Sequence, residues 1–199
     1  MSIVYECDDG LYINVTNECM NRCEFCIRNA TESVGNATTL WLDELPSPED
    51  IIKDLLSYDI GSYKEIVFCG FGEPLIELDT VIRVAREIKE ITDVPVRVNT
   101  NGLANIYHTR DITLELFGLI DKISISLNAK NAKDYDVLCK SEYGEDAFDA
   151  VLDFIRCAKN NIPDVTISVL DFLKPEDIEA CRKIADDLGV KLRVRKYIV

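Results

Sequence analysis

Residues 122–128 read Lys-Ile-Ser-Ile-Ser-Leu-Asn, and this strict alternation decides the fold. Successive side chains of a β-strand point to opposite faces, so the segment predicts a strand with one apolar and one polar face. The same one-sided pattern recurs in Leu11–Thr16, Val96–Asn99, Val165–Val169 and Lys191–Val194. Strands covered by helices on both faces would instead be continuous apolar runs. The polar faces therefore predict a cavity on one side of the sheet.

Helical patterns separate these strands. Ser47–Asp50 begins a helix with a cap residue, a proline at the first helical position and acids in the first turn. Four further helices are predicted over Leu78–Ile91, Ile112–Phe117, Ala147–Asn160 and Pro175–Leu188, and one further strand over Glu65–Cys69. Strands that alternate with helices predict a parallel sheet with right-handed crossovers, which disfavours an exposed antiparallel sheet. We expect one α/β domain over residues 1–199, a partial (β/α)6 barrel with parallel strands and helices on the outer face.

Composition excludes several function classes. The chain has 22 basic and 36 acidic residues, a net charge of −14, and no basic stripe that would bind nucleic acid. No apolar run approaches the roughly 20 residues of a membrane span, and the N-terminus lacks the basic region of a signal peptide, so a cytoplasmic location is expected. Eight cysteines in that reducing compartment indicate metal binding or catalysis rather than disulfides. The single histidine, His108, argues against Ser-His-Asp triads and most zinc hydrolase sites.

A cysteine motif follows the first predicted strand. Cys19, Cys23 and Cys26 have the spacing C-x3-C-x2-C, which turns three thiolates toward one point. Thiolates suit a soft metal or an iron–sulfur cluster, and three of them leave one iron of a four-iron cluster open. Two other interpretations exist: buried structural cysteines on one helix face, and a zinc site completed by Cys69 or His108. Polar residues between the cysteines disfavour the first, whereas spacing alone does not reject zinc.

The C-x3-C-x-aromatic-C spacing resembles the signature of the radical S-adenosylmethionine (SAM) superfamily. In that family the cysteines hold three irons of a [4Fe-4S] cluster, and the fourth iron binds the amino and carboxylate groups of SAM. Cys69–Pro74 (Cys-Gly-Phe-Gly-Glu-Pro) is similar to the family's Gly-Gly-Glu-Pro element, although Phe71 stands where glycine is common. The ends of the third and fourth strands are similar to segments that contact SAM in relatives. A Gly-x-Ile-x-Gly element is absent from the fifth strand.

The resemblance implies a set of site residues. Cys19, Cys23 and Cys26 would be the metal ligands, and the SAM-binding residues would be Phe25, Gly70, Phe71, Gly72, Glu73, Pro74, Asn99, Asn101, Ser124, Ser126 and Asn128. The resemblance covers nearly the whole chain, and three segments beginning at Leu11, Ser124 and Phe148 look closer still to small radical SAM proteins associated with the TatD family. It implies a reduced cluster that cleaves SAM to a 5′-deoxyadenosyl radical, which abstracts hydrogen from a substrate. Such an oxidoreductase or lyase would need an electron donor such as flavodoxin or ferredoxin.

Three arginines give an expectation about the substrate. Arg97, Arg193 and Arg195 fall on the polar face of their strands, which predicts an anionic substrate group. A small molecule fits these arginines, whereas an open mouth without a capping domain fits a protein substrate, as in a glycyl-radical activase. A non-catalytic iron–sulfur protein and a zinc module are the remaining alternatives. The other cysteines (Cys7, Cys69, Cys139, Cys157 and Cys181) show no second C-x2-C pattern, so no second cluster is expected.

Overall fold

One sheet organises the chain, and its strands lie side by side in sequence order. The computed structural model describes residues 1–197. Its strands are β1 (Val4–Cys7), β2 (Gly10–Ile13), β3 (Glu65–Phe68), β4 (Val96–Thr100), β5 (Lys122–Ser126), β6 (Asp164–Leu170) and β7 (Lys191–Arg195). β1 and β2 are antiparallel, and every later pair is parallel. The two edge strands, β1 and β7, do not pair with each other, so the barrel is open.

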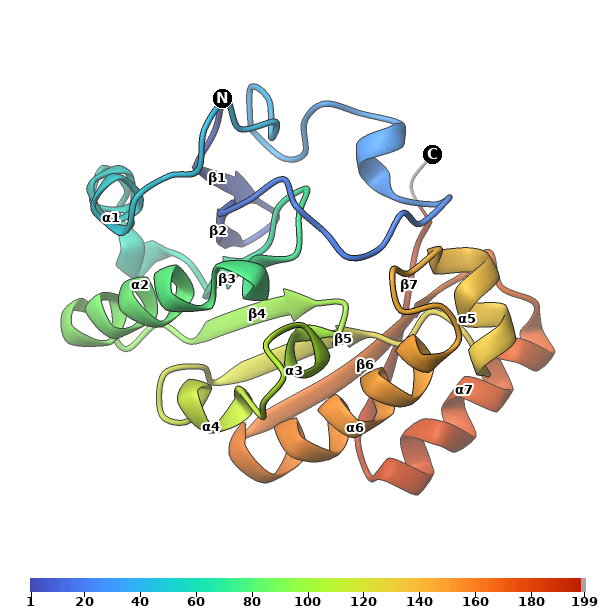
Figure 1. The fold of residues 1–199 in the computed structure, drawn as a ribbon. Coiled ribbons are helices and arrows are strands. Elements are labelled where there is room, and N and C mark those ends of the chain that lie inside the picture. The colour runs from blue at the N-terminus through green and yellow to red at the C-terminus, as the bar shows by residue number, and fades with distance from the viewer. Residues whose placement is uncertain (198–199) are drawn as a thin grey trace.

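Helices cover the outer face of this curved sheet (Figure 1). They are α1 (Pro48–Leu55), α2 (Leu78–Ile91), α3 (Ala104–Tyr107), α4 (Thr113–Leu116), α5 (Ala132–Cys139), α6 (Asp146–Asn161) and α7 (Pro175–Leu188). α1 begins as the sequence predicts: the Ser47 hydroxyl accepts from the Asp50 backbone N–H, and the Asp50 carboxylate accepts from the Ser47 backbone N–H. This reciprocal pair satisfies two backbone donors that the first helical turn leaves without partners.

The apolar faces of the strands form the core. Ile13, Val98, Ile125 and Ile167 are fully buried and belong to one cluster with the inner faces of α2 and α6. The opposite faces carry polar side chains, of which Ser168 is almost completely buried. The alternation read from the sequence therefore separates a packed outer layer from a polar concave side.

The structure differs from expectation at its first pair of strands and at the helices α3 and α5, and the one-turn helix α3 was not predicted. The first predicted strand, Leu11–Thr16, ends at Ile13, and the unpredicted strand β1 pairs with it through a tight turn in which Asp8 adopts a positive φ of 51°. The helix α5 was also not predicted, because only Tyr135 and Cys139 of its eight residues are buried and its apolar periodicity is weak. β1 and α5 matter for the site, since β1 forms one edge of the sheet and α5 packs beside the cysteine loop.

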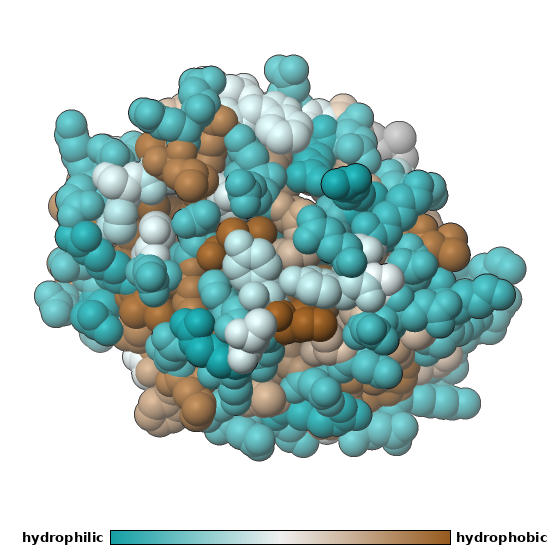
Figure 2. All heavy atoms as spheres, in the orientation of Figure 1, coloured by the Kyte–Doolittle hydropathy of each residue, from teal (hydrophilic) through white to brown (hydrophobic). Residues whose placement is uncertain are grey.

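The face seen in Figure 2 is largely hydrophilic. Figure 2 shows charged and polar side chains over most of the visible face, with apolar side chains in separate small groups. No helix within residues 1–197 is long and apolar enough to cross a membrane.

Candidate functional site

A cavity of about 270 Å³ lies where the parallel strands end. The carboxyl ends of parallel strands are where open α/β sheets bind ligands. Predicted site residues that line it are Cys19, Cys23, Phe25, Cys26, Gly70, Phe71, Gly72, Glu73, Asn99, Asn101, Ser126, Asn128 and Arg195. They come from the loop after β2 and from the ends of β3, β4, β5 and β7. The structure thus brings together most of the set that the sequence predicts.

Four predicted residues do not line the cavity. Pro74 is buried at the start of a short turn, and Ser124 lies one step back along β5. Arg97 does not serve as a free cation, because its guanidinium binds the Glu65 carboxylate at 2.8 Å. Arg193 is exposed on the edge strand β7. The expectation of three arginines in the cavity is therefore corrected to one, Arg195.

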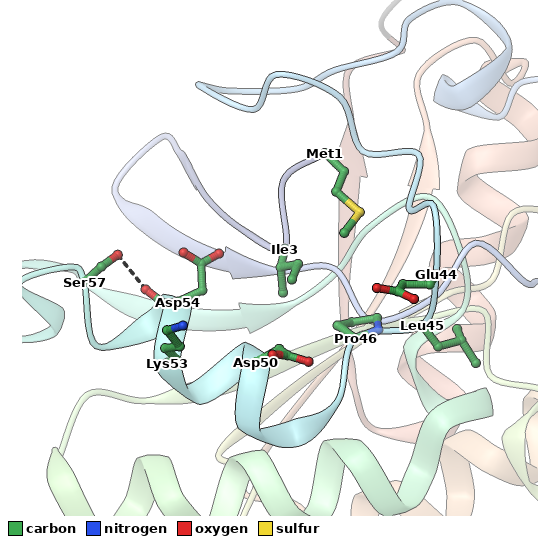
Figure 3. A pocket seen from close by; sticks show the side chains of 9 residues that line it. All are labelled: Met1, Ile3, Glu44, Leu45, Pro46, Asp50, Lys53, Asp54 and Ser57. Atoms are coloured by element: carbon green, nitrogen blue, oxygen red, sulfur yellow. Dashed lines mark hydrogen bonds between the residues drawn. The ribbon is translucent and has the colours of Figure 1, made fainter.

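A larger hollow, about 460 Å³, lies elsewhere (Figure 3). It is formed by the N-terminal residues and α1 and contains none of the predicted site residues. The Asp54 carboxylate beside it already accepts a hydrogen bond from the backbone of Val4 at 3.0 Å. Size alone therefore does not locate the site, and the smaller cavity is the one with convergent polar and thiol groups.

The three motif thiols are partly buried. Burial raises the pKa of Cys19 to about 11, with a further rise from Glu73, and the Asn101 amide donates to the Cys19 sulfur at 3.7 Å. The pKa of Cys23 is raised strongly, first by a hydrogen bond with the Cys139 thiol and then by burial. Burial also raises the pKa of Cys26. Without metal these groups are neutral thiols, so metal binding must displace their protons.

The glycine element packs directly on the chain that precedes the cysteines. A Cβ added to Gly72 would lie 2.3 Å from the Thr16 carbonyl oxygen, and one added to Gly70 would lie 1.9 Å from the Asn14 side-chain oxygen. The sequence suggests that small residues here allow a close approach to a ligand; the structure shows that they allow a close approach to the end of β2. The element and the cysteine loop are consequently held as one unit.

The Glu73 carboxylate binds the end of β4. It accepts from the Asn101 backbone N–H at 2.6 Å, from the Thr100 hydroxyl at 2.7 Å and from the Leu75 backbone N–H at 3.1 Å. Burial raises the pKa of Glu73 to about 7, and the three donors partly oppose this rise. One buried carboxyl group thus joins the glycine element to the Asn99–Gly102 turn.

The three motif thiols line one cavity, and thiolates are the donors that iron–sulfur clusters take. Within residues 1–197, no three Cys, His, Asp or Glu side chains lie close enough together to hold one metal ion. Cluster ligands bind different iron atoms, so they need not meet at one point. The Nε2 atom of His108 bonds the Leu75 carbonyl oxygen at 2.8 Å, and His108 lies outside the cavity, which removes it as a zinc ligand.

The cavity also fits a polar cofactor. The side-chain oxygens of Asn21 and Asn128 and the Nε of Arg195 are buried there without hydrogen-bond partners among the described residues. Buried polar atoms are normally satisfied, so such atoms in a cavity wall indicate a polar ligand. Adenosyl, amino-acid and carboxylate groups offer the required donors and acceptors.

Several cavity residues were missed from the sequence. They are Asn21, Ile27, Thr100, Leu170, Lys196 and Tyr197. Asn21 lies between two predicted ligands, a position that could have identified it. The contacts of Tyr197 and Phe172 had no such signal: Phe172 contacts both Phe25 and Tyr197 with ring centroids 5.3 Å apart, and these residues are distant in sequence.

The chain is similar in sequence to known proteins of one superfamily. The radical SAM superfamily model matches residues 13–188. A putative glycyl-radical enzyme activating enzyme of Methanocaldococcus jannaschii is 33% identical over 144 residues, covering 70% of this chain and 56% of that protein. A probable GTP 3′,8-cyclase of the same organism is 27% identical over 194 residues, covering 95% and 59%. The chain therefore spans less than three fifths of either relative.

A solved structure has the same fold. SuiB of Streptococcus suis, in a crystal structure bound to S-adenosylmethionine, superposes with a TM-score of 0.68 at 14% identity. The match covers 94% of this chain and 40% of that one. At this identity the likeness concerns the fold alone, which agrees with the largely parallel sheet and outer helices described above.

Proposed function

Because the chain belongs to the radical SAM superfamily, with a [4Fe-4S] cluster and SAM as its cofactors, we propose that Cys19, Cys23 and Cys26 hold the cluster and that the adjoining cavity binds SAM and substrate. One observation carries this proposal. The three cysteines, the glycine element and the polar strand ends are far apart in sequence, yet all line one cavity of about 270 Å³. The proposed activity is hydrogen abstraction from a substrate, started by reductive cleavage of SAM.

The chain's residues supply binding and orientation. When bound, the cluster and SAM together supply the electron transfer and the adenosyl radical chemistry. Glu73 holds the Asn99–Gly102 turn, and the glycine element fixes the loop that carries Cys19. Phe25 lines the cavity, and its ring packs on that of Phe172 with centroids 5.3 Å apart. The free side-chain oxygen of Asn128 is an acceptor for a bound ligand.

The position of Arg195 supports the proposal that the substrate carries an anionic group. Its guanidinium lines the cavity, is partly buried and has no carboxylate partner among the described residues. Burial lowers the pKa of Arg195, and the neighbouring Arg97 and Arg193 lower it further. A desolvated cation without a counter-ion is stabilised by an anion, and the planar guanidinium suits carboxylates and phosphates.

Arg195→Gln is therefore expected to weaken anion binding by about tenfold, the loss of one charge-assisted hydrogen bond. The measurement is calorimetric titration of the SAM-loaded protein with small carboxylates and phosphate monoesters. Arg193→Gln is the matched control, because that arginine is exposed on the same strand, and it should leave affinity unchanged. Equal losses in the two variants, or a loss of SAM affinity alone in Arg195→Gln, would reject a substrate-binding role.

The function itself is tested by anaerobic reconstitution with iron and sulfide. Adding SAM should change the EPR spectrum of the reduced cluster, and adding dithionite should produce 5′-deoxyadenosine, measured by chromatography. In the cell, a flavodoxin or ferredoxin would take the place of dithionite. A four-iron cluster whose spectrum is indifferent to SAM would instead identify an electron carrier, and a colourless zinc-loaded protein would identify a zinc module.

A second candidate function is activation of a partner protein by hydrogen abstraction from one of its glycines. It is favoured by the 33% identity with a relative named as a glycyl-radical enzyme activating enzyme. A glycine-containing partner loop should then raise 5′-deoxyadenosine formation and acquire a glycine-centred EPR signal, whereas small anions should not raise it. Association with the TatD family stays a prediction from the quoted segments.

A further inference from the structure

The side chain of Arg28 binds three backbone carbonyls around the cysteine motif. Its Nη1 atom donates to the carbonyl oxygens of Asn17 at 3.3 Å and Phe71 at 3.5 Å, and its Nη2 atom donates to that of Asn21 at 3.4 Å. Asn17 and Asn21 stand two residues before and two residues after Cys19, whereas Phe71 belongs to the glycine element. One guanidinium thus joins both flanks of the first motif cysteine to the glycine element.

A short turn directs Arg28 back toward the loop. Ile27–Asn29 forms one turn of 3₁₀ helix directly after Cys26, and the Asn29 backbone N–H donates to the Cys26 carbonyl at 2.9 Å. The Asn29 side-chain amide also donates to the Cys23 carbonyl at 3.2 Å. The position of Arg28 relative to the motif is therefore set by hydrogen bonds on both sides of it.

Arginine suits this place because of its shape. It carries five N–H donors in a rigid planar fork, so its two terminal nitrogens serve separate acceptors at the same time. In the part of the chain that the structure describes, no carboxylate forms an ion pair with Arg28 and competes for these donors. Lysine would keep the charge, but all its donors are on one nitrogen.

The three carbonyls belong to residues that the fold also holds by other contacts. The Asn17 side chain exchanges two hydrogen bonds with the Leu42 backbone, at 2.8 and 3.0 Å. The Asn21 amide donates to the hydroxyl of the buried Tyr135 at 3.0 Å, and Phe71 is buried in a second apolar cluster. Loss of the guanidinium is therefore expected to loosen the three segments relative to one another without unfolding any of them.

We propose that Arg28 is a positioning residue for SAM, which holds the glycine element in a fixed position relative to the loop that carries the cluster ligands. This inference rests on the proposed function, since it requires SAM to bind across these two parts of the cavity. Arg28 does not line the cavity, so it acts through the segments that do. A ligand that contacts both parts loses contacts when one moves relative to the other.

The test is calorimetric titration of the reconstituted holoenzyme with SAM. Arg28→Gln removes the fork and is expected to weaken SAM binding about tenfold, with an unchanged number of SAM sites per cluster. A variant that only destabilised the fold would lower the number of sites and leave their affinity unchanged. Arg28→Lys should stay within about threefold of Arg28→Gln, because it restores the charge but not the fork.

Arg22→Gln is the matched control. Arg22 lies between Cys19 and Cys23, and its side chain is exposed, so this variant should bind SAM like the wild type. Wild-type protein that binds no four-iron cluster, or that binds a cluster but no SAM, would overturn the proposed function. Wild-type SAM affinity in Arg28→Gln or in Arg28→Lys would overturn the role of the fork alone, and so would an equal loss in Arg22→Gln.

If Arg28→Gln does not load a cluster, hydrogen exchange of the unloaded proteins decides. The Glu73 backbone N–H donates to the Glu18 carbonyl at 2.7 Å, across the contact between the glycine element and the cysteine loop. Its exchange should be about tenfold faster in Arg28→Gln than in the wild type, whereas the amides of α2 should exchange alike in both. Equal exchange of the Glu73 amide in the two proteins would reject the positioning role.

Discussion

Replacing Cys19, Cys23 or Cys26 by alanine is expected to remove the cluster and with it all SAM cleavage. Each cysteine would bind a different iron, so no remaining ligand of the set can substitute for a lost one. Iron content should fall from about four atoms per chain to near zero, and 5′-deoxyadenosine should become undetectable. Iron and sulfide analysis, absorbance and product chromatography after anaerobic reconstitution measure the effect.

The control for this series is Cys157→Ala. Cys157 is partly buried on α6 and does not line the cavity, so its variant should load iron and cleave SAM like the wild type. Cys69→Ala is a sharper comparison, because Cys69 does line the cavity without belonging to the motif. Loss of the cluster in Cys69→Ala, or its retention in a motif variant, would refute the assignment of the three ligands.

The alternation of residues 122–128 predicts the site because it determines which side chains face the cavity. A strand with one apolar face must bury that face under helices, so its polar side chains and its carboxyl end are positioned together. Asn128 and Ser126 reach the cavity for this reason, and the motif cysteines reach it because they follow the first parallel strand. The helix α2 has the predicted bounds, Leu78–Ile91, because its apolar stripe is regular.

Alternation could not predict which polar groups pair with one another. Arg97 does lie on the polar side of β4, but Glu65 on the neighbouring strand β3 neutralises it, and Lys122 on β5 binds the same carboxylate at 3.2 Å. Such cross-strand pairs depend on register, which a single strand pattern does not define. The backbone hydrogen bonds that join α5 to the loop around Cys23 were hidden similarly, because they require α5, whose weak periodicity gave no helix prediction.

Gly72→Ala is expected to destabilise the protein by about 3 kcal/mol, at the upper end of the range for overpacked sites, and to weaken SAM binding. The new Cβ would lie 2.3 Å from the Thr16 carbonyl oxygen and 2.6 Å from that of Glu18, and backbone atoms cannot rotate away as a side chain can. The Glu18 carbonyl also accepts from the Glu73 backbone N–H at 2.7 Å. Relief of the clash must therefore displace either the glycine element or the residues that lead into Cys19.

Gly61→Ala provides the matched control for that displacement. At Gly61 the nearest atom to an added Cβ is the Asp59 carboxylate oxygen at 3.9 Å, so an ordinary contact results. Urea unfolding should place the Gly61 variant within about 0.5 kcal/mol of the wild type. Calorimetry on the reconstituted protein should show reduced SAM affinity only for Gly72→Ala. If the two variants unfold alike and bind SAM alike, the glycine element does not hold the cysteine loop in place.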